Sequence, residues 1–273
     1  MLILPKKILK KGQTLENSPN FFVKFATSDS EYLAAQRLRY KVFISELGGR
    51  GDLVDHENKL ERDRFDPYFE HLILIDRAQQ SNYDCGVVGV YRLMTDEKAK
   101  ALGRFYSEDE YDLTKLKQSG RKLLELGRSC VHPDYRGGTA VFHLWKGLSE
   151  FVQRQEIEIL FGVASFQGTD LNAIAAPLSL LHQHHLAPPE LRVTVKAQKA
   201  QKMDIIPPES LDRRKAVLEI PALIKAYLRL GGFVGHGAFV DYDFNTTDVC
   251  LILDTKRMHG RQKEIYSKYE ISK

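Results

Sequence analysis

The stretch from Leu123 to Ala140 constrains the fold more than any other part of this chain. It reads as an apolar strand containing two polar side chains, Glu125 and Arg128, followed by a turn with adjacent glycines, Gly137 and Gly138. An apolar helical run begins directly afterwards. A strand that enters a helix through a glycine turn presents free backbone N–H groups, and such groups bind anions. The sequence therefore predicts an anion-binding corner between a strand and a helix.

Gly127 interrupts the strand between its two polar side chains. A glycine inside a strand is typical of a β-bulge, which re-aims side chains and frees a backbone N–H. A carboxylate, a guanidinium and free amides beside an anion site are groups that can catalyse acyl transfer. An ordinary glycine loop with a structural Glu–Arg pair is the alternative interpretation of the same residues.

The rest of the chain predicts mixed strands and helices. We expect strands over residues 20–26, 71–76, 85–94, 157–166 and 249–253, and the start of a strand in 191–203. Ser28 and Glu31 form a capping box ahead of one helix, Thr169 or Asp170 caps another, and Pro221 opens a third. Residues 96–120 show no clear pattern. We expect residues 20–273 to form one α+β domain, which includes a C-terminal extension.

Composition and motif counts exclude several classes of protein. Forty basic against 36 acidic side chains give a net charge of +4, whereas nucleic-acid binding needs a stronger, clustered excess. Cys85, Cys130 and Cys250 are far apart and form no CxxC, so we expect neither zinc nor disulfides but a cytoplasmic protein. Only His182 and His185 share a helix face, without a third ligand, so no metal is expected.

Residues 1–19 mix lysines with aliphatic residues. No apolar run reaches the roughly 20 residues that a membrane span needs. One hypothesis is that this segment touches an anionic bilayer, which makes the protein peripheral at the inner membrane face. A solvated chain terminus is the alternative.

Several separate motifs resemble one branch of a known superfamily. They are Arg39 and Phe43, the aspartates Asp63 and Asp66, Arg92 at the end of an apolar strand, and Glu125-Leu126-Gly127-Arg128. These are similar to the Arg-x-x-x-Phe, paired-aspartate, strand-arginine and Glu-x-x-Arg motifs of acyl-carrier-protein-dependent GNAT acyltransferases. That branch includes the acyl-homoserine lactone synthases and the ornithine N-alpha-acyltransferases. The resemblance implies a GNAT-like fold, a central mixed twisted sheet flanked by helices.

The C-terminal half separates these two relatives. Residues 161–170, 182–189, 221–231 and 245–249 resemble the ornithine enzymes. The tryptophan that the lactone synthases usually have shortly after the phenylalanine is absent, and glycines stand in its neighbourhood. The resemblance extends from about residue 31 to about residue 254.

The resemblance implies an N-acyltransferase that moves a 3-hydroxy fatty acyl group to the α-amine of L-ornithine, giving lyso-ornithine lipid. Its co-substrate is the phosphopantetheine thioester of acyl carrier protein, and no bound cofactor is expected. Two alternatives stay open. One is an acyl-homoserine lactone synthase that uses S-adenosylmethionine, and the other is a non-catalytic module that binds acyl donors or membranes.

The resemblance also implies roles for named residues. Glu125 accepts the proton of the amine, and Arg128 organises the acids and the substrate carboxylate. The substrate-binding residues are Arg39, Phe43, Asp63, Asp66 and Arg92. The acyl-donor-binding residues are Val131, Arg136, Gly137, Gly138 and Thr139. Covalent transfer through Cys130, with His132 as base, is an alternative to direct attack.

Acyl carrier proteins are strongly acidic, so a basic docking face is expected. The chain offers two sources, Lys146 and Arg154 after the glycine turn, and the acid-free run with Arg192, Lys196, Lys199 and Lys202. Solvated lysines are the alternative interpretation.

Overall fold

A computed structural model describes residues 18–79 and 84–258. The basic segment 1–19 therefore lies almost wholly outside the described residues, as does most of the C-terminal extension. None of the described helices is long and apolar enough to cross a bilayer.

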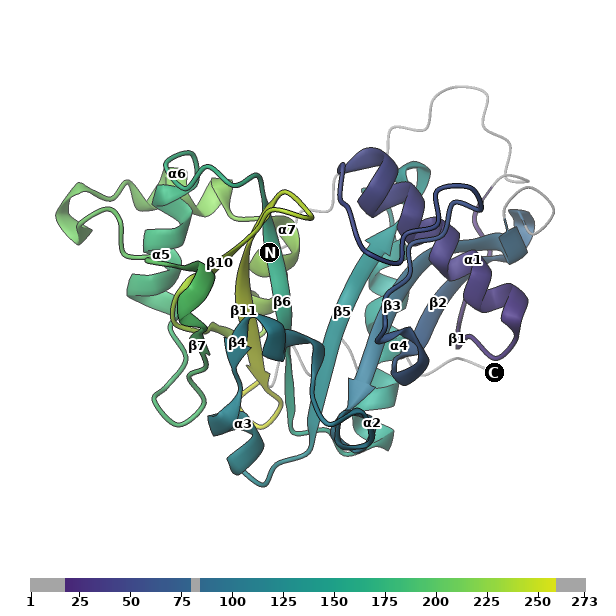
Figure 1. Ribbon diagram of the computed structural model, residues 1–273, viewed down its shortest axis with the longest axis horizontal. Helices are drawn as coiled ribbons and strands as arrows, with labels where there is room; N and C mark the ends of the chain where they lie inside the picture. The colour runs from purple at the N-terminus through teal and green to yellow at the C-terminus, as the bar shows by residue number, and fades with distance from the viewer. Residues whose placement is uncertain (1–17, 80–83, 259–273) are drawn as a thin grey trace.

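A mixed sheet organises the described chain (Figure 1). The strands are β1 (Phe21–Phe25), β2 (Glu70–Asp76), β3 (Val87–Thr95), β4 (Tyr111–Asp112), β5 (Leu123–Val131), β6 (Ile159–Gln167), β7 (Thr194–Val195), β8 (Ala200–Gln201), β9 (Phe233–Val234), β10 (Ala238–Asp241) and β11 (Thr246–Asp254). The α-helices are α1 (Asp29–Arg39), α2 (Asp96–Leu102), α3 (Thr114–Gln118), α4 (Ala140–Arg154), α5 (Ala175–His185), α6 (Arg213–Glu219) and α7 (Ala222–Arg229). A π-helix, η2 (Tyr40–Glu46), continues α1, and a 3-10 helix, η6 (Tyr106–Asp109), precedes β4.

The strand order is β1-β2-β3-β5-β6-β11-β10-β8, with β9 paired to β11. Neighbouring strands are antiparallel except β5 and β6, which run parallel and pair only from Leu123 with Ile159 to Glu125 with Phe161. Beyond that point the two strands diverge (Figure 1). At Gly162, where pairing ends, an added Cβ would lie 2.1 Å from the Leu126 carbonyl oxygen, so only glycine fits.

The predicted bulge in β5 is confirmed. Val90 pairs with Cys130 but Arg92 pairs with Gly127, so β5 has one extra residue at this point. The residue with a positive φ, 49°, is Arg128 and not the glycine. The bulge thus re-aims the arginine side chain directly.

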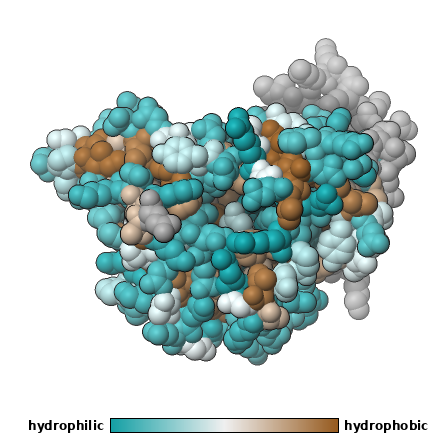
Figure 2. Space-filling model, in the orientation of Figure 1, coloured by the Kyte–Doolittle hydropathy of each residue, from teal (hydrophilic) through white to brown (hydrophobic). Residues whose placement is uncertain are grey.

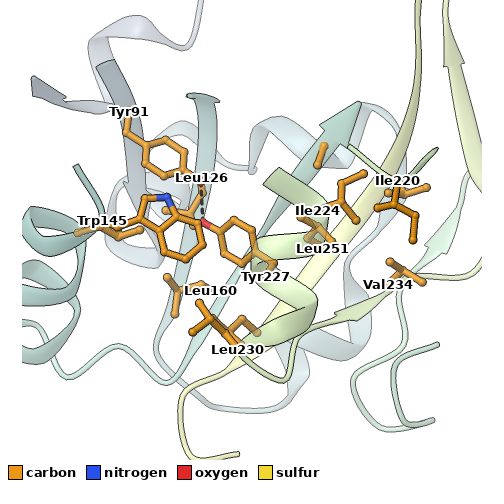
Figure 3. Close-up of a cluster of buried hydrophobic side chains, with 14 of the residues drawn as sticks. Tyr91, Leu126, Trp145, Leu160, Ile220, Ile224, Tyr227, Leu230, Val234 and Leu251 are labelled. Atoms are coloured by element: carbon orange, nitrogen blue, oxygen red, sulfur yellow. Dashed lines mark hydrogen bonds between the residues drawn. The ribbon is translucent and has the colours of Figure 1, made fainter. Parts of the chain in front are cut away.

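Helices cover both faces of the sheet. Alternate side chains of β2 point to opposite faces, and each face packs against its own helix. Ile73 and Ile75 pack with α1, whereas Leu72 and Leu74 pack with α4. Helix α7 joins the second cluster, where the Tyr91 and Tyr227 hydroxyls are 2.6 Å apart and the Trp145 ring lies 4.9 Å from the Tyr227 ring (Figure 3).

The five fully bounded strand predictions correspond to β1, β2, β3, β6 and β11, and the helices after Ser28 and Pro221 are present. Three expectations need correction. Residues 96–120 contain α2, η6, β4 and α3. Helix α5 begins at Ala175, and its N-cap, Ile174, makes no side-chain hydrogen bond, so the expected caps at Thr169 and Asp170 are wrong. Residues 191–203 form no continuous strand but the two short strands β7 and β8, with a 3-10 helix (Ala197–Lys199) between them.

Candidate active site

Two cavities meet where β5 and β6 diverge. The larger, about 850 Å³, and the smaller, about 350 Å³, share four lining residues, Tyr106, Arg128, Asp241 and Phe244. Residues 127–129 of β5 and 163–165 of β6 line the smaller cavity. The bulged strand and the diverging pair therefore open onto the smaller cavity.

A buried ion-pair network lies beneath the larger cavity. Arg39, fully buried at the end of α1, pairs with Glu61 and donates from Nη1 to Asp66 Oδ1 at 2.7 Å. Arg92, also fully buried, donates from Nη1 to Asp66 Oδ1 at 2.6 Å and to Asp63 Oδ1 at 2.9 Å. Burial alone would raise the pKa of Glu61, but the neighbouring arginines hold it below its usual value. These carboxylates are therefore ionised and paired.

The network reaches the cavities through Arg128. Its Nε donates to Glu61 Oε1 at 3.1 Å and its Nη1 to the Tyr106 hydroxyl at 3.2 Å. Its guanidinium lies 5.8 Å from the Phe43 ring and 4.6 Å from the Phe244 ring. Burial would lower the pKa of Arg128, yet Tyr106 and Glu61 keep it well above the usual value. A permanent positive charge therefore lines both cavities.

The structure brings the predicted substrate-binding residues together but pairs them mainly with one another. Asp63 lines the larger cavity, and Arg92 and Phe43 line the smaller one. Arg39 and Asp66 line neither of these two. Direct contact of any of them with a substrate stays a prediction.

Glu125 lies behind the cavities and lines neither of them. Its side chain is 1% exposed, and its oxygens accept the backbone N–H groups of Tyr106 at 2.8 Å and Ser107 at 2.6 Å. Burial raises its pKa to about 7, against the lowering effect of these hydrogen bonds. The geometry shows a carboxylate that positions η6, and through it Tyr106. Its part in proton transfer stays a prediction.

The predicted glycine turn lies directly ahead of α4. Gly137 has a φ of +73°, with open space around its Cβ position, and Thr139 is an N-cap without a side-chain hydrogen bond. Arg136 donates from Nη2 to Glu46 Oε2 at 2.7 Å and from Nε to the Val131 carbonyl at 3.1 Å. Donor binding by these residues stays a prediction.

The structure favours direct attack over the covalent alternative through Cys130. Burial raises the pKa of the Cys130 thiol to about 12, so the reactive thiolate is disfavoured at neutral pH. The His132 ring does not serve it as a base, because Nε2 lies 2.6 Å from Lys41 Nζ and Nδ1 accepts the Asp134 N–H.

His182, one of the two histidines that share a helix face, lies against the ring of His236, with 5.7 Å between the ring centroids.

Sequence reasoning missed several residues that line the cavities. They are Glu61, Tyr106, Phe244 and three clustered carboxylates, Glu110, Asp241 and Asp248. Glu61 had only the density of acids in its loop as a signal. Tyr106 and Glu110 belong to the segment without a clear pattern. No local pattern brings these residues together, because their partners come from distant elements.

Comparison with known proteins bears on fold and family. A family model described as an acetyltransferase (GNAT) domain matches residues 38–146, which confirms the predicted fold. The L-ornithine N(alpha)-acyltransferase of Rhodobacter capsulatus is 55% identical over 249 residues, 91% of this chain and 95% of that protein. The Brucella abortus protein of the same name is 42% identical over 247 residues, 89% of this chain and 88% of that protein.

One solved structure that matches this chain is the CoA-dependent acyl-homoserine lactone synthase BjaI with SAM and isopentyl-CoA. It is 12% identical, with a TM-score of 0.48, over 92% of this chain and 89% of that one. A similarity of this size supports no conclusion about the activity of this chain.

Proposed function

Because this chain belongs to the L-ornithine N(alpha)-acyltransferase family, we propose that it transfers a fatty acyl group from a thioester to the α-amine of L-ornithine. The observation that supports this in the structure is the meeting of two cavities at Arg128, where β5 bulges and parts from β6. Two substrates must approach one point for acyl transfer, and this arrangement offers each a separate entrance.

In this proposal the thioester lies in the smaller cavity. Apolar side chains of Tyr91, Leu126 and Leu223 line its inner side and suit an acyl chain. Arg128 and Ser129 lie outside the β3–β5 pairing, so the bulge offers N–H groups to the oxyanion that forms during attack. The ammonium form first loses one proton, and the neutral amine then adds to the thioester carbonyl. Collapse of the resulting oxyanion breaks the carbon–sulfur bond, and a second proton of the nitrogen ends on the released thiol.

The acceptor lies in the larger cavity. Arg128 suits the α-carboxylate of ornithine because its guanidinium lines both cavities and is permanently charged. The α-amine must lose a proton before or during attack. Glu125 reaches that proton only through an intervening group, since it lines neither cavity. We therefore assign Glu125 chiefly to positioning Tyr106 and Arg128.

For the donor we propose the phosphopantetheine thioester of acyl carrier protein, with its phosphate at residues 136–139 ahead of α4. The open space around Gly137 and the uncapped helix N-terminus support this assignment. We also retain the proposal that residues 1–19 contact an anionic membrane surface, where the lipid product would accumulate.

Mass spectrometry tests the proposed reaction. The purified protein is incubated with a 3-hydroxyacyl thioester of acyl carrier protein and L-ornithine. We expect an acyl-ornithine amide and free carrier-protein thiol in equal amounts. Formation of a lactone from S-adenosylmethionine instead would identify a lactone synthase. Donor binding without product would identify a non-catalytic module.

A further inference from the structure

Three carboxylates from distant parts of the chain converge between the two cavities. Glu110 follows η6, Asp241 ends β10 and Asp248 lies in β11, and one oxygen of each lies within 4.8 Å of the others. Glu110 lines the larger cavity, Asp248 the smaller one, and Asp241 both. We call these residues the acidic trio.

Two members of the acidic trio are buried, and each has one carboxylate oxygen without a hydrogen-bond partner. Glu110 and Asp248 are each 4% exposed, and Glu110 Oε2 and Asp248 Oδ1 have no hydrogen-bond partner within the described residues. Asp241 accepts the N–H groups of Asp243 at 2.8 Å and Phe244 at 3.1 Å. Buried polar atoms are nearly always hydrogen-bonded, because an unpaired buried carboxylate oxygen destabilises the fold. Orphaned atoms at a cavity wall therefore indicate a ligand with hydrogen-bond donors.

The electrostatics indicate that this ligand is a cation. Burial raises the pKa of Asp248 to about 6 and that of Glu110 well above its usual value, and the neighbouring carboxylates add to both effects. No lysine, arginine or histidine of the described chain forms an ion pair with the acidic trio. A bound cation would offset the mutual repulsion of the three carboxylates.

Three of the cations that line the cavities have other contacts. Arg128 is bound to Glu61 and Tyr106. Lys196 donates to the backbone carbonyl of Glu108, and Lys199 Nζ lies 5.3 Å from the centre of the Phe239 ring. These three cations therefore do not neutralise the acidic trio, in line with the absence of an ion pair to it among the described residues.

We propose that Glu110, Asp241 and Asp248 form the specificity pocket for the side-chain ammonium of the acceptor amino acid. This inference rests on the proposed function and deepens it. An ammonium group has three N–H donors, which suits three converging carboxylates. With Arg128 at the α-carboxylate and the acidic trio at the δ-ammonium, the two charged ends of ornithine fix its direction in the site. The α-amine is then the end that faces the thioester.

The test compares two acceptors that differ only at the δ position. L-norvaline has the carbon skeleton of L-ornithine without the δ-amine. We measure kcat/KM for both acceptors in the wild-type protein, Asp248→Asn and Glu110→Gln. The control is Asp243→Asn, which changes an exposed acid that lines the larger cavity outside the acidic trio. We expect the ornithine-to-norvaline preference to fall about 10- to 100-fold in the two variants, mainly through KM, and to persist in the control.

Thermal unfolding without acyl donor gives a readout that does not depend on activity. Ornithine should raise the unfolding temperature of the wild-type protein more than norvaline does, and Asp248→Asn should abolish the difference. Without ligand, the variant should unfold at or above the wild-type temperature, because it removes a repelling charge.

Three results would overturn the inference. The first is an unchanged acceptor preference in the variants. The second is an equal loss of kcat/KM with both acceptors, together with a lower unfolding temperature. The third is stabilisation of the wild-type protein by Mg²⁺ or Ca²⁺ alone that Asp248→Asn removes. The last would make the acidic trio a metal site. If the wild-type protein acylates neither amino acid, the proposed function fails. The unfolding temperatures with ornithine and norvaline then still show whether the acidic trio binds the δ-ammonium.

Discussion

The backbone of Arg128 has a positive φ of 49°, a conformation that residues other than glycine seldom adopt. Such a conformation costs about 1–3 kcal/mol and persists only where the surroundings enforce it. Here Glu61, Tyr106 and the Phe244 ring hold the side chain. The strained residue also lines both cavities, so the same contacts that enforce the strain place the guanidinium where the two cavities meet.

Replacement of Glu125 by Gln tests whether this carboxylate is mainly structural. The amide NH₂ would face one of the two N–H groups that the carboxylate now accepts, so one buried donor loses its partner. We expect the free energy of unfolding to fall by about 1–3 kcal/mol, and turnover to fall with it as Tyr106 shifts. Chemical denaturation and steady-state kinetics check this, with the exposed Glu97→Gln as the matched control. Unchanged stability with kcat reduced by about 100-fold or more would instead assign Glu125 to proton transfer.

The pKa of Asp248 predicts a pH dependence of stability. In the unfolded chain an aspartate ionises near pH 4, but in the fold Asp248 ionises at about 6, because burial and Asp241 oppose its charge while Ser165 and Arg128 only partly favour it. The contribution of Asp248 to stability is therefore present below pH 4 and is lost as the pH rises from about 4 to 6. We expect the ligand-free protein to lose on the order of 2 kcal/mol over this range relative to Asp248→Asn. If the free energy of unfolding changes with pH equally in the wild-type protein and in Asp248→Asn, the raised pKa is contradicted.

At the scale of elements, the close approach of β6 to β5 at the end of their pairing depends on Gly162. An added Cβ would lie 2.1 Å from the Leu126 carbonyl oxygen, and backbone cannot yield as a side-chain tip does. We expect Gly162→Ala to cost about 3 kcal/mol or more in unfolding free energy. Gly127→Ala is the matched control in the facing strand, because its Cβ would approach no atom closer than 3.9 Å. Equal stabilities of the two variants would show that the two strands accommodate a Cβ atom at position 162.

The local patterns explain why β5, its bulge and α4 were predictable. An apolar strand, an internal glycine and a glycine turn ahead of an apolar helix are all signals within one short segment. The π-helix η2 was not predictable, because its sequence continues the apolar stripe of α1 and differs from an α-helix only in hydrogen bonding. It matters to the site because it places Phe43 against the Arg128 guanidinium.

At the scale of the whole molecule, the site joins elements from nearly the full described chain. Arg39 comes from α1, Glu61 from a loop, Arg128 from β5 and Asp248 from β11. The sequence indicated the family motifs one by one, including Arg39, Asp63 and Asp66. It did not indicate that Arg39 pairs with Glu61, or that Asp248 lies beside Glu110, because long-range packing decides both contacts.

The surface in the view of Figure 2 is largely hydrophilic, with hydrophobic residues in separate patches. Docking of a large acidic partner would therefore depend on charge more than on a broad apolar face. Two basic sets are available. Lys199 and Lys202 are exposed near the larger cavity, which Lys199 lines, and Lys146 and Arg154 lie on α4.

We predict that Lys199→Glu combined with Lys202→Glu slows reaction with the carrier-protein thioester about 10-fold at low salt. Reversal of two exposed charges weakens the attraction that steers an acidic partner, and added salt screens the same attraction, so the salt dependence of kcat/KM should become shallower. A small acyl-pantetheine donor has no acidic face, and its rate should change little. Lys146→Glu with Arg154→Glu alters the charge equally on α4 and is the matched control. Equal loss with both donors would show that Lys199 acts through the cavity and its contact with Phe239, and a loss confined to the α4 variant would move the docking face to that helix.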